Sequence, residues 1–138
     1  MESKERAAKL LGEMCTIYLA TLRKDGLPDV RAISATKAEG LKTIWMISGQ
    51  EEKKSKELAK NPNCTIYTTA MQDDEHYVEL RLWGTAELLT DTVSRQTAWH
   101  DAYYDYFKDI NDPIIQVIKF TTKTGTITTE KGMEEISF

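Results

Sequence analysis

The sequence predicts a mainly β fold, an antiparallel barrel or sandwich, and two features of the chain support this. Strand-like segments follow one another across short turns, and only three segments have the pattern of a helix. Short connections join antiparallel strands, whereas parallel strands need long crossovers. Closure into a barrel would also remove exposed sheet edges. The expected order is one helix, three strands, one helix, two strands, one helix and two strands.

The first third of the chain is expected to hold a helix and three strands. Residues 3–14 form an amphipathic pattern, with apolar residues on one stripe at Ala7, Leu10, Leu11 and Met14. Asp25-Gly26 is a strong hairpin signal between the first two strands. The apolar run of the third strand indicates burial on both faces. The three strands are expected over 15–22, 28–37 and 41–48.

A second helix is expected over residues 51–60, and Asn61-Pro62 ends it because proline cannot continue a helix. Ser48 and Glu51 have the spacing of a capping box at its start. The inner face of this helix is expected to consist of Ser55, Leu58 and Ala59.

The second half is expected to contain four strands and one helix. The strands cover 64–70, 76–89, 114–121 and 124–129, the last two as a pair around Lys123. Asp91 is the expected N-cap of a helix that continues to about residue 107. Alternation along 76–89 places apolar residues on one face. These are Val78, Leu80, Leu82, Ala86 and Leu88, opposite Tyr77, Glu79, Arg81, Trp83 and Thr85.

Two interpretations of the second face of strand 76–89 stay open. Its mixture of aromatic and charged side chains is typical of contact with another subunit or a ligand. Alternatively, the 91–107 helix covers Trp83 and the strand is an ordinary surface strand. The aromatic residues of that helix are expected to pack in the core rather than stack on a cofactor. They are Trp99, Tyr103, Tyr106 and Phe107.

Size and charge narrow the functional classes. The 138 residues are expected to form one domain, 1–138, and a net charge of −4 argues against nucleic-acid binding. The charged first segment is not a signal peptide, and no apolar run approaches the ~20 residues of a membrane span. Cys15 and Cys64 are expected to be free thiols in a reducing compartment. We therefore expect a cytoplasmic protein that binds no membrane.

The residue patterns of the common catalytic sites are missing from the sequence. His76 and His100 are isolated, the two cysteines lack zinc spacing, and there is no glycine-rich phosphate loop. We therefore predict no metal site and assign no catalytic residue. If the protein is an enzyme, a bound cofactor is expected to supply the reactivity.

Three cations are candidates for binding an anion. Arg31 lies on a strand beside Ile33, and Lys53 and Lys54 open the second helix. Pairing of strands 28–37 and 41–48 would let these cations and the Ser48 hydroxyl converge, and such a set suits a phosphate group. The alternative is that the lysines are ordinary solvated residues.

Four segments of the chain together resemble a known family. They are "YLATLRKDGLPDVRAIS", "IWMISGQEEKKSKELAKNPN", "VELRLWGTAELLTD" and "DPIIQVIKF", and they span almost all of the chain after the first helix. Their order and spacing resemble the flavin-binding split barrels of the pyridoxamine 5'-phosphate oxidase-like superfamily, in particular the short general-stress-protein branch.

The resemblance implies a six-stranded antiparallel split β-barrel that forms a homodimer and holds FMN at the subunit interface. The implied cofactor-binding residues are Arg31, Ala32, Ile33, Ser34, Ile47, Ser48, Lys53, Lys54 and Glu79. The expected function is that of an FMN-dependent oxidoreductase of unknown substrate. The alternatives are a non-catalytic flavin-binding protein of stress or sensing, and a relative that binds a deazaflavin or haem in the same barrel.

Several positions depart from the pattern of that family. Lys53 replaces an arginine, Glu52 stands where a helix-capping serine is usual, and Glu79 replaces a glutamine near the flavin ring. No tryptophan stands near Thr128, where many relatives cover the flavin with one. The C-terminal "KGMEEISF" lacks the Arg and His residues that hold a vitamin B6 substrate, so oxidation of pyridoxamine phosphate is not expected.

Overall fold

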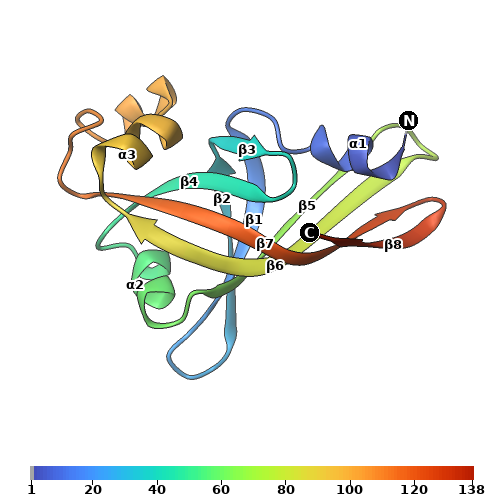
Figure 1. Ribbon diagram of the computed structural model, residues 1–138, viewed down its shortest axis with the longest axis horizontal. Coiled ribbons are helices and arrows are strands. Elements are labelled where there is room, and N and C mark those ends of the chain that lie inside the picture. The colour runs from blue at the N-terminus through green and yellow to red at the C-terminus, as the bar shows by residue number, and fades with distance from the viewer. Residues whose placement is uncertain (1) are drawn as a thin grey trace.

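The computed structural model describes residues 2–138, and its centre is a strongly curled antiparallel sheet (Figure 1). Six strands of seven or more residues form a split barrel, as the sequence predicts. They are β1 (Cys15–Leu22), β2 (Pro28–Ala35), β4 (Thr43–Gly49), β5 (Asn63–Met71), β6 (Tyr77–Leu89) and β7 (Ile115–Thr129). The short strands β3 (Lys37–Glu39) and β8 (Gly132–Ser137) extend the sheet.

The strand order is β2-β1-β5-β6-β7-β4-β3, with β8 paired to β7. Strand β2 therefore pairs on one side only, with β1, and it lies beside β4 without a ladder between them. The barrel is split at this place. Because β2 is an edge strand, every second residue directs its backbone N–H and C=O away from the sheet.

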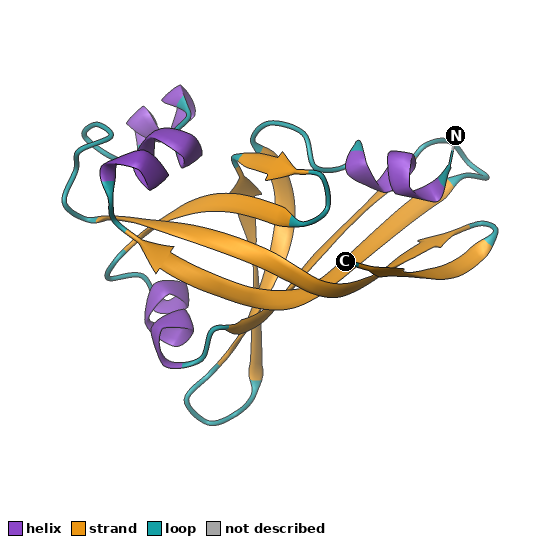
Figure 2. Cartoon of the chain, in the orientation of Figure 1, coloured by secondary structure: helices purple, strands orange, loops and turns teal. Residues whose placement is uncertain are grey.

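The helices lie outside the sheet (Figure 2). They are α1 (Ser3–Ala8), α2 (Lys53–Lys60), α3 (Thr92–Ala98) and the 3₁₀ helix η1 (Asp101–Asp105). None of these helices in residues 2–138 is long and apolar enough to cross a membrane.

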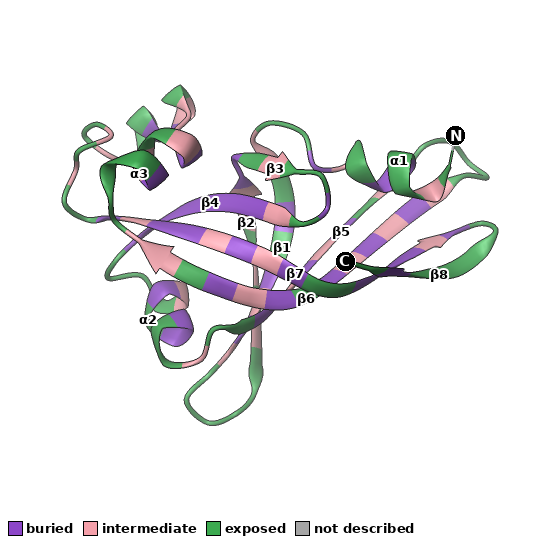
Figure 3. Ribbon diagram, in the orientation of Figure 1, coloured by how far each residue is buried: buried purple, intermediate pink, exposed green. Residues whose placement is uncertain are grey.

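The core fills the inside of the curled sheet, and the predicted alternation of β6 is confirmed. Val78, Leu80 and Leu82 are fully buried, whereas Trp83 on the other face is exposed. Buried segments recur along the β6 ribbon between less buried ones (Figure 3). Strand β4 is buried on both faces beyond its first residue, as expected from its apolar run. A second, smaller apolar cluster lies under α3, around Trp45, Ile115 and Val117. Cys15 and Cys64 are both free.

Two helix predictions are wrong in length. Helix α1 ends at Ala8 instead of residue 14, and Met14 takes a left-handed conformation with φ 52°. The predicted helix 91–107 is divided into α3 and η1, because Trp99 and His100 are extended. The His100 side chain accepts a hydrogen bond from the Ala102 N–H and so offers the backbone an alternative to helix.

The two predicted strands around Lys123 form one continuous strand, β7. The pairing with β6 shifts between Trp83 and Gly84, so Lys123 is the extra residue of a β-bulge rather than a turn. A side chain at Gly84 would collide with the Thr121 backbone, which explains the glycine at this place. Strand β8 was not predicted: it is an edge strand with mostly exposed residues and therefore lacks an apolar alternation.

Helix α2 begins at Lys53, later than predicted, and the capping box of Ser48 and Glu51 is wrong. The N-cap is Glu52, and its side chain makes no capping hydrogen bond to a backbone N–H of the helix. The predicted inner face is correct for Ser55 and Leu58. Its third member is Glu57, which is buried, whereas Ala59 is exposed.

Candidate functional site

A cavity of about 630 Å³ opens where the barrel is split. We call it the strand-edge cavity. Its walls come from β2, from the end of β4 and the following turn into α2, and from the segment around η1. The lining includes the predicted residues Ala32, Ile33, Ser34, Ile47 and Lys54. The structure therefore brings five of the nine predicted cofactor-binding residues to one cavity.

One wall of the strand-edge cavity is aromatic. Tyr103, Tyr106 and Phe107 line it, and the Tyr106 side chain is 76% exposed. Tyr103 shares a 2.8 Å hydrogen bond with the Thr36 hydroxyl, and burial raises the pKa of its phenol. The predicted packing role is correct for Trp99, Tyr103 and Phe107, which join the second apolar cluster. Sequence reasoning missed their place beside the cavity, because it expected one regular helix.

Glu52 collects the hydrogen-bond donors at the rim of this cavity. Its Oε2 accepts from the Ser48 hydroxyl at 2.9 Å and from the Gly49 N–H at 2.5 Å, and its Oε1 lies 3.0 Å from the Lys54 ammonium. Burial alone would raise the pKa of Glu52, but the bonds from Gly49, Lys54 and Ser48 outweigh it and lower the pKa. The donors of Ser48, Gly49 and Lys54 therefore form an anion-binding site, and the Glu52 carboxylate of the same chain occupies it.

Arg31 and Lys53 meet at a different carboxylate. Both cations bind Asp29 Oδ2, at 3.1 Å from Arg31 and 3.0 Å from Lys53. The hydrogen bond from Lys53 is the main cause of the lowered pKa of Asp29. Arg31 also bonds Glu57 at 3.0 Å and the Thr21 hydroxyl at 2.8 Å, at the end of the barrel beneath α2. The three predicted cations therefore do not share one point, since Lys54 lies beside Glu52.

The remaining predicted residues lie outside the cavity wall. The Ser48 side chain is buried behind the wall, where its hydroxyl also accepts a 3.0 Å hydrogen bond from Ser55. Glu79 lies on the outer face of β6, where it pairs with Arg81 and accepts a 2.8 Å hydrogen bond from Tyr67.

The outer sheet face that carries Glu79 is continuous with the cavity. Residues opposite one another on paired strands share a face. One cross-strand row runs Val30, Ala20, Thr65 and Trp83, and the next runs Ala32, Tyr18, Tyr67 and Arg81. Ala32 belongs to this face and also lines the cavity. Val30 is 62% exposed and Tyr18 43%, and Trp83 is not covered by α3, which packs against β4 and β7.

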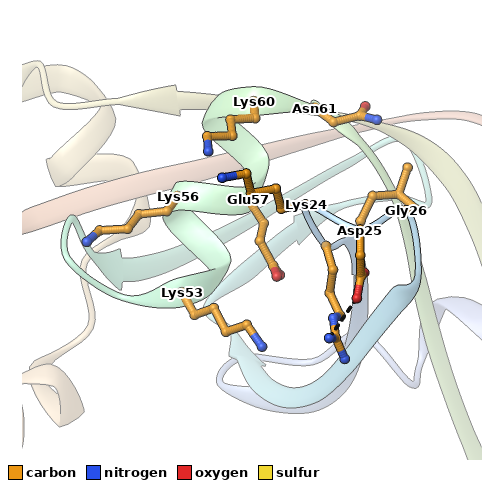
Figure 4. A pocket seen from close by; sticks show the side chains of 10 residues that line it. Lys24, Asp25, Gly26, Lys53, Lys56, Glu57, Lys60 and Asn61 are labelled. Carbon is orange, nitrogen blue, oxygen red and sulfur yellow. Dashed lines mark hydrogen bonds and ion pairs between the residues drawn. The ribbon is translucent and has the colours of Figure 1, made fainter.

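A second cavity, of about 690 Å³, lies between the β1–β2 hairpin loop and α2 (Figure 4). We call it the lysine cavity, because Lys24, Lys53, Lys56 and Lys60 line it. Lys53 and Lys54 are consecutive at the start of α2, yet Lys53 lines the lysine cavity and Lys54 the strand-edge cavity. Of these four lysines, only Lys53 was predicted as part of an anion site, and its grouping with Lys24 depends on how the hairpin loop lies against α2.

By its fold, this protein belongs to the class of split antiparallel barrels, with a cavity of ligand size at the free strand edge. The family model described as Pyridoxamine 5'-phosphate oxidase matches residues 3–129. The chain therefore belongs to the pyridoxamine 5'-phosphate oxidase family. No curated protein matches the chain.

Solved structures share the fold over the whole chain. A Clostridium acetobutylicum protein related to general stress protein 26 has a TM-score of 0.82 at 23% identity, covering 100% of this chain and 97% of its own. General stress protein 26 of Bacillus anthracis has a TM-score of 0.77 at 22% identity, with 100% of both chains covered. A haem-binding protein of Mycobacterium smegmatis has 0.78 at 18% identity, covering 99% of this chain and 58% of its own.

Proposed function

We propose that this protein binds FMN in the strand-edge cavity and acts as a flavin-dependent oxidoreductase. The observation that carries the proposal is the cavity itself: in a chain of this family, it gathers Ala32, Ile33, Ser34 and Ile47 at the free edge of β2 with Lys54 at the start of α2. Its size of about 630 Å³ is in the range of cofactor sites.

The residues present fit the ring system of a flavin. The outward backbone N–H and C=O groups of β2 are free to bond the polar edge of the ring, because β2 pairs with β1 alone. The apolar side chains of Ile33 and Ile47 suit the planar faces. The exposed Tyr106 is placed to cover a bound ligand and to exclude water from it.

Binding of the flavin phosphate requires an exchange of anions. Lys54 would hold the phosphate together with the Ser48 hydroxyl and the Gly49 N–H, but the Glu52 carboxylate now accepts from all three. A phosphate monoester carries about −1.5 to −2 charge and accepts several hydrogen bonds, so it competes with a single carboxylate for these donors. We expect Glu52 to turn away when the phosphate binds.

The bound flavin would supply the hydride chemistry, and the chain would supply binding and orientation. Lys54 and the Ser48 hydroxyl would fix the phosphate end, and the edge of β2 would fix the ring. Substrate would enter along the aromatic wall of Tyr103 and Tyr106. We assign no residue to proton transfer.

We further propose that the protein is a homodimer whose second copy covers the outer sheet face. This face carries exposed apolar side chains at Tyr18, Val30 and Trp83 and is continuous with the cavity through Ala32. A second copy there would complete the cavity rim, and its own Glu79 and Arg81 would be candidates to approach the flavin.

Haem is a second candidate only because the M. smegmatis neighbour is a haem-binding protein. Haem iron is commonly held by His or Cys, and in some proteins by Met or Tyr. Among residues 2–138, no His or Cys lines the strand-edge cavity, whereas Met14, Tyr103 and Tyr106 do. The free edge of β2 and the missing His and Cys favour flavin, and a deazaflavin would use the same strand edge and cation.

The test is the absorption spectrum and mass of the purified protein, followed by titration with FMN. We expect the two visible bands of oxidised flavin and quenching of FMN fluorescence on binding. Lys54→Gln should weaken FMN binding about tenfold, whereas the matched control Lys131→Gln, on the β7–β8 turn, should not. A Soret band, or equal affinity in both variants, would contradict the proposal. Turnover of NAD(P)H or a quinone by the loaded protein separates an enzyme from a flavin carrier.

A further inference from the structure

The lysine cavity holds an excess of positive charge in a chain whose net charge is −4. Five cationic side chains line it, Arg23, Lys24, Lys53, Lys56 and Lys60, against two carboxylates, Asp25 and Glu57, which leaves three positive charges in excess. Charges of one sign in such proximity repel one another, and a bound anion relieves the repulsion.

The two carboxylates are both paired with arginines, so they do not neutralise the lysines. Glu57 bonds Arg31 and the Thr21 hydroxyl, at 3.0 and 2.7 Å. Asp25 pairs with Arg23 at 2.8 Å in the hairpin loop. Lys53 shares Asp29 with Arg31.

The remaining lysines have weak partners or none. Lys56 pairs with Glu51 at 3.2 Å, but both side chains are largely exposed, and such surface pairs contribute little. Among the described residues, Lys24 and Lys60 make no ion pair. They come from separate elements, the hairpin loop and the last residue of α2, and meet at one cavity (Figure 4).

The strand-edge cavity offers a contrast on the other side of α2. Its charged lining residues are Glu51, Glu52 and Lys54, and Lys54 is paired with Glu52. The first turn of α2 therefore separates a cavity with excess negative charge from one with excess positive charge. By charge alone, an anion is attracted more strongly to the lysine cavity than to the strand-edge cavity.

We propose that the lysine cavity is a second binding site, for the diphosphate group of a small organic molecule such as a nucleotide. One phosphate monoester carries about −1.5 to −2 charge near neutral pH, so a diphosphate group matches an excess of three cations. Lysines bind phosphate as point charges and do not need the fork geometry of arginine. Leu22 and the lysine stems provide apolar surface for the organic part. The site does not depend on flavin binding.

The test is isothermal titration calorimetry of the full chain with inorganic pyrophosphate and with ADP. We expect saturable binding of both, and weaker binding of inorganic sulfate, which carries less charge. Lys24→Gln/Lys60→Gln removes the two cations that make no ion pair and should weaken pyrophosphate binding at least tenfold. It should also reduce the salt dependence of the affinity, because fewer charges take part.

The matched control is Lys4→Gln/Lys9→Gln, which removes the same charge from two exposed residues, one on α1 and one at its C-cap. Equal affinity in the two double variants would show only a general attraction of anions to lysines and would overturn the proposal. No binding of pyrophosphate would also overturn it. Loading with FMN separates the two proposals: pyrophosphate should still bind, and if FMN abolishes this binding, the lysine cavity is part of the flavin site and the second site is wrong.

Discussion

Glu52 neutralises Lys54, one of the two cations at the start of α2. It stands at the N-cap, but its carboxylate does not cap a backbone N–H of the helix and instead accepts from Ser48, Gly49 and the Lys54 ammonium. Because these hydrogen bonds lower its pKa, the carboxylate is charged throughout the neutral range. Any phosphate that uses Lys54 has to displace it.

Glu52→Gln should therefore raise the affinity for FMN, by about three- to tenfold, since it removes one negative charge beside the proposed phosphate position. Glu5→Gln is the matched control, because Glu5 is exposed on α1 and does not line the strand-edge cavity. Fluorescence titration of both variants at one ionic strength measures the change. Weaker binding by Glu52→Gln would mean that the carboxylate serves the ligand rather than competing with it.

Among single residues, the cations could be identified from the sequence, but their carboxylate partners could not. Arg31, Lys53 and Lys54 were predicted as an anion site from their positions. Glu57 lies 26 residues from Arg31, and its burial was not predicted, because a charged residue is rarely fully buried unless paired. The pairing that makes its burial possible depends on how α2 packs on the barrel end, which no local pattern encodes.

Among the secondary-structure elements, α1 is attached to the sheet by the burial of Ala7 in the core and by one buried arginine. Arg6 is 8% exposed and bonds both oxygens of Glu130, each at 2.9 Å. It also donates to Gln72 Oε1 at 3.0 Å and to the Tyr77 carbonyl at 2.8 Å. One side chain therefore joins α1 to the β5–β6 loop, to the start of β6 and to the β7–β8 turn.

This contact makes the stability of the protein sensitive to acid. The hydrogen bond from Arg6 lowers the pKa of Glu130 from 4.5 to about 2. A carboxyl whose pKa is lowered on folding stabilises the fold above its unfolded pKa, and the stabilisation is lost as the pH falls through the folded pKa. Glu130→Gln should lower Tm by a few degrees at pH 7, and the difference from wild type should shrink between about pH 4.5 and about 2.

Thermal unfolding followed by circular dichroism over this pH range measures the effect. Glu135→Gln is the control, on the exposed part of the same hairpin. A difference in Tm that does not depend on pH would mean that Glu130 contributes by packing rather than by its charge.

Elements with a strong local signal were predicted from the sequence, and those shaped by tertiary contacts were not. The Asp25-Gly26 turn is confirmed, with Gly26 at φ 86°. The continuity of β7 was missed, because a bulge at Lys123 and a turn look alike in sequence: both interrupt the alternation. The interruption of the predicted helix at Trp99 was missed, because it depends on hydrogen bonds that form only in the folded chain. The Ala102 N–H donates to His100, and the Trp99 indole N–H donates to Asp101.

For the molecule as a whole, the curled sheet leaves one large face without cover. The fold class was predictable, because alternation and hairpin turns recur along the whole chain. The uncovered face was predicted only as one of two alternatives. No local sequence pattern distinguishes a strand face that is covered by a helix from one that contacts another subunit. The structure excludes the alternative in which the helix after β6 covers Trp83, because α3 packs against β4 and β7 instead.

The proposed homodimer can be tested with two valines of similar exposure. Val30 is 62% exposed on the outer face of β2, and Val93 is 70% exposed on α3. Val30→Glu would bury a charge in the proposed interface, a cost that the remaining contacts cannot offset, so the dimer should dissociate. Val93→Glu changes the net charge equally but lies off this face and should leave the dimer intact.

Size-exclusion chromatography with light scattering measures the outcome against the chain mass of 15.7 kDa. We expect twice this mass for the wild type and for Val93→Glu, and the single mass for Val30→Glu. Because the outer face adjoins the strand-edge cavity at Ala32, the monomeric variant should also bind FMN more weakly. A wild-type monomer would exclude the dimer, and a dimeric Val30→Glu variant would place the subunit contact on another surface. Full FMN affinity in a monomeric variant would show that one copy of the chain completes the site alone.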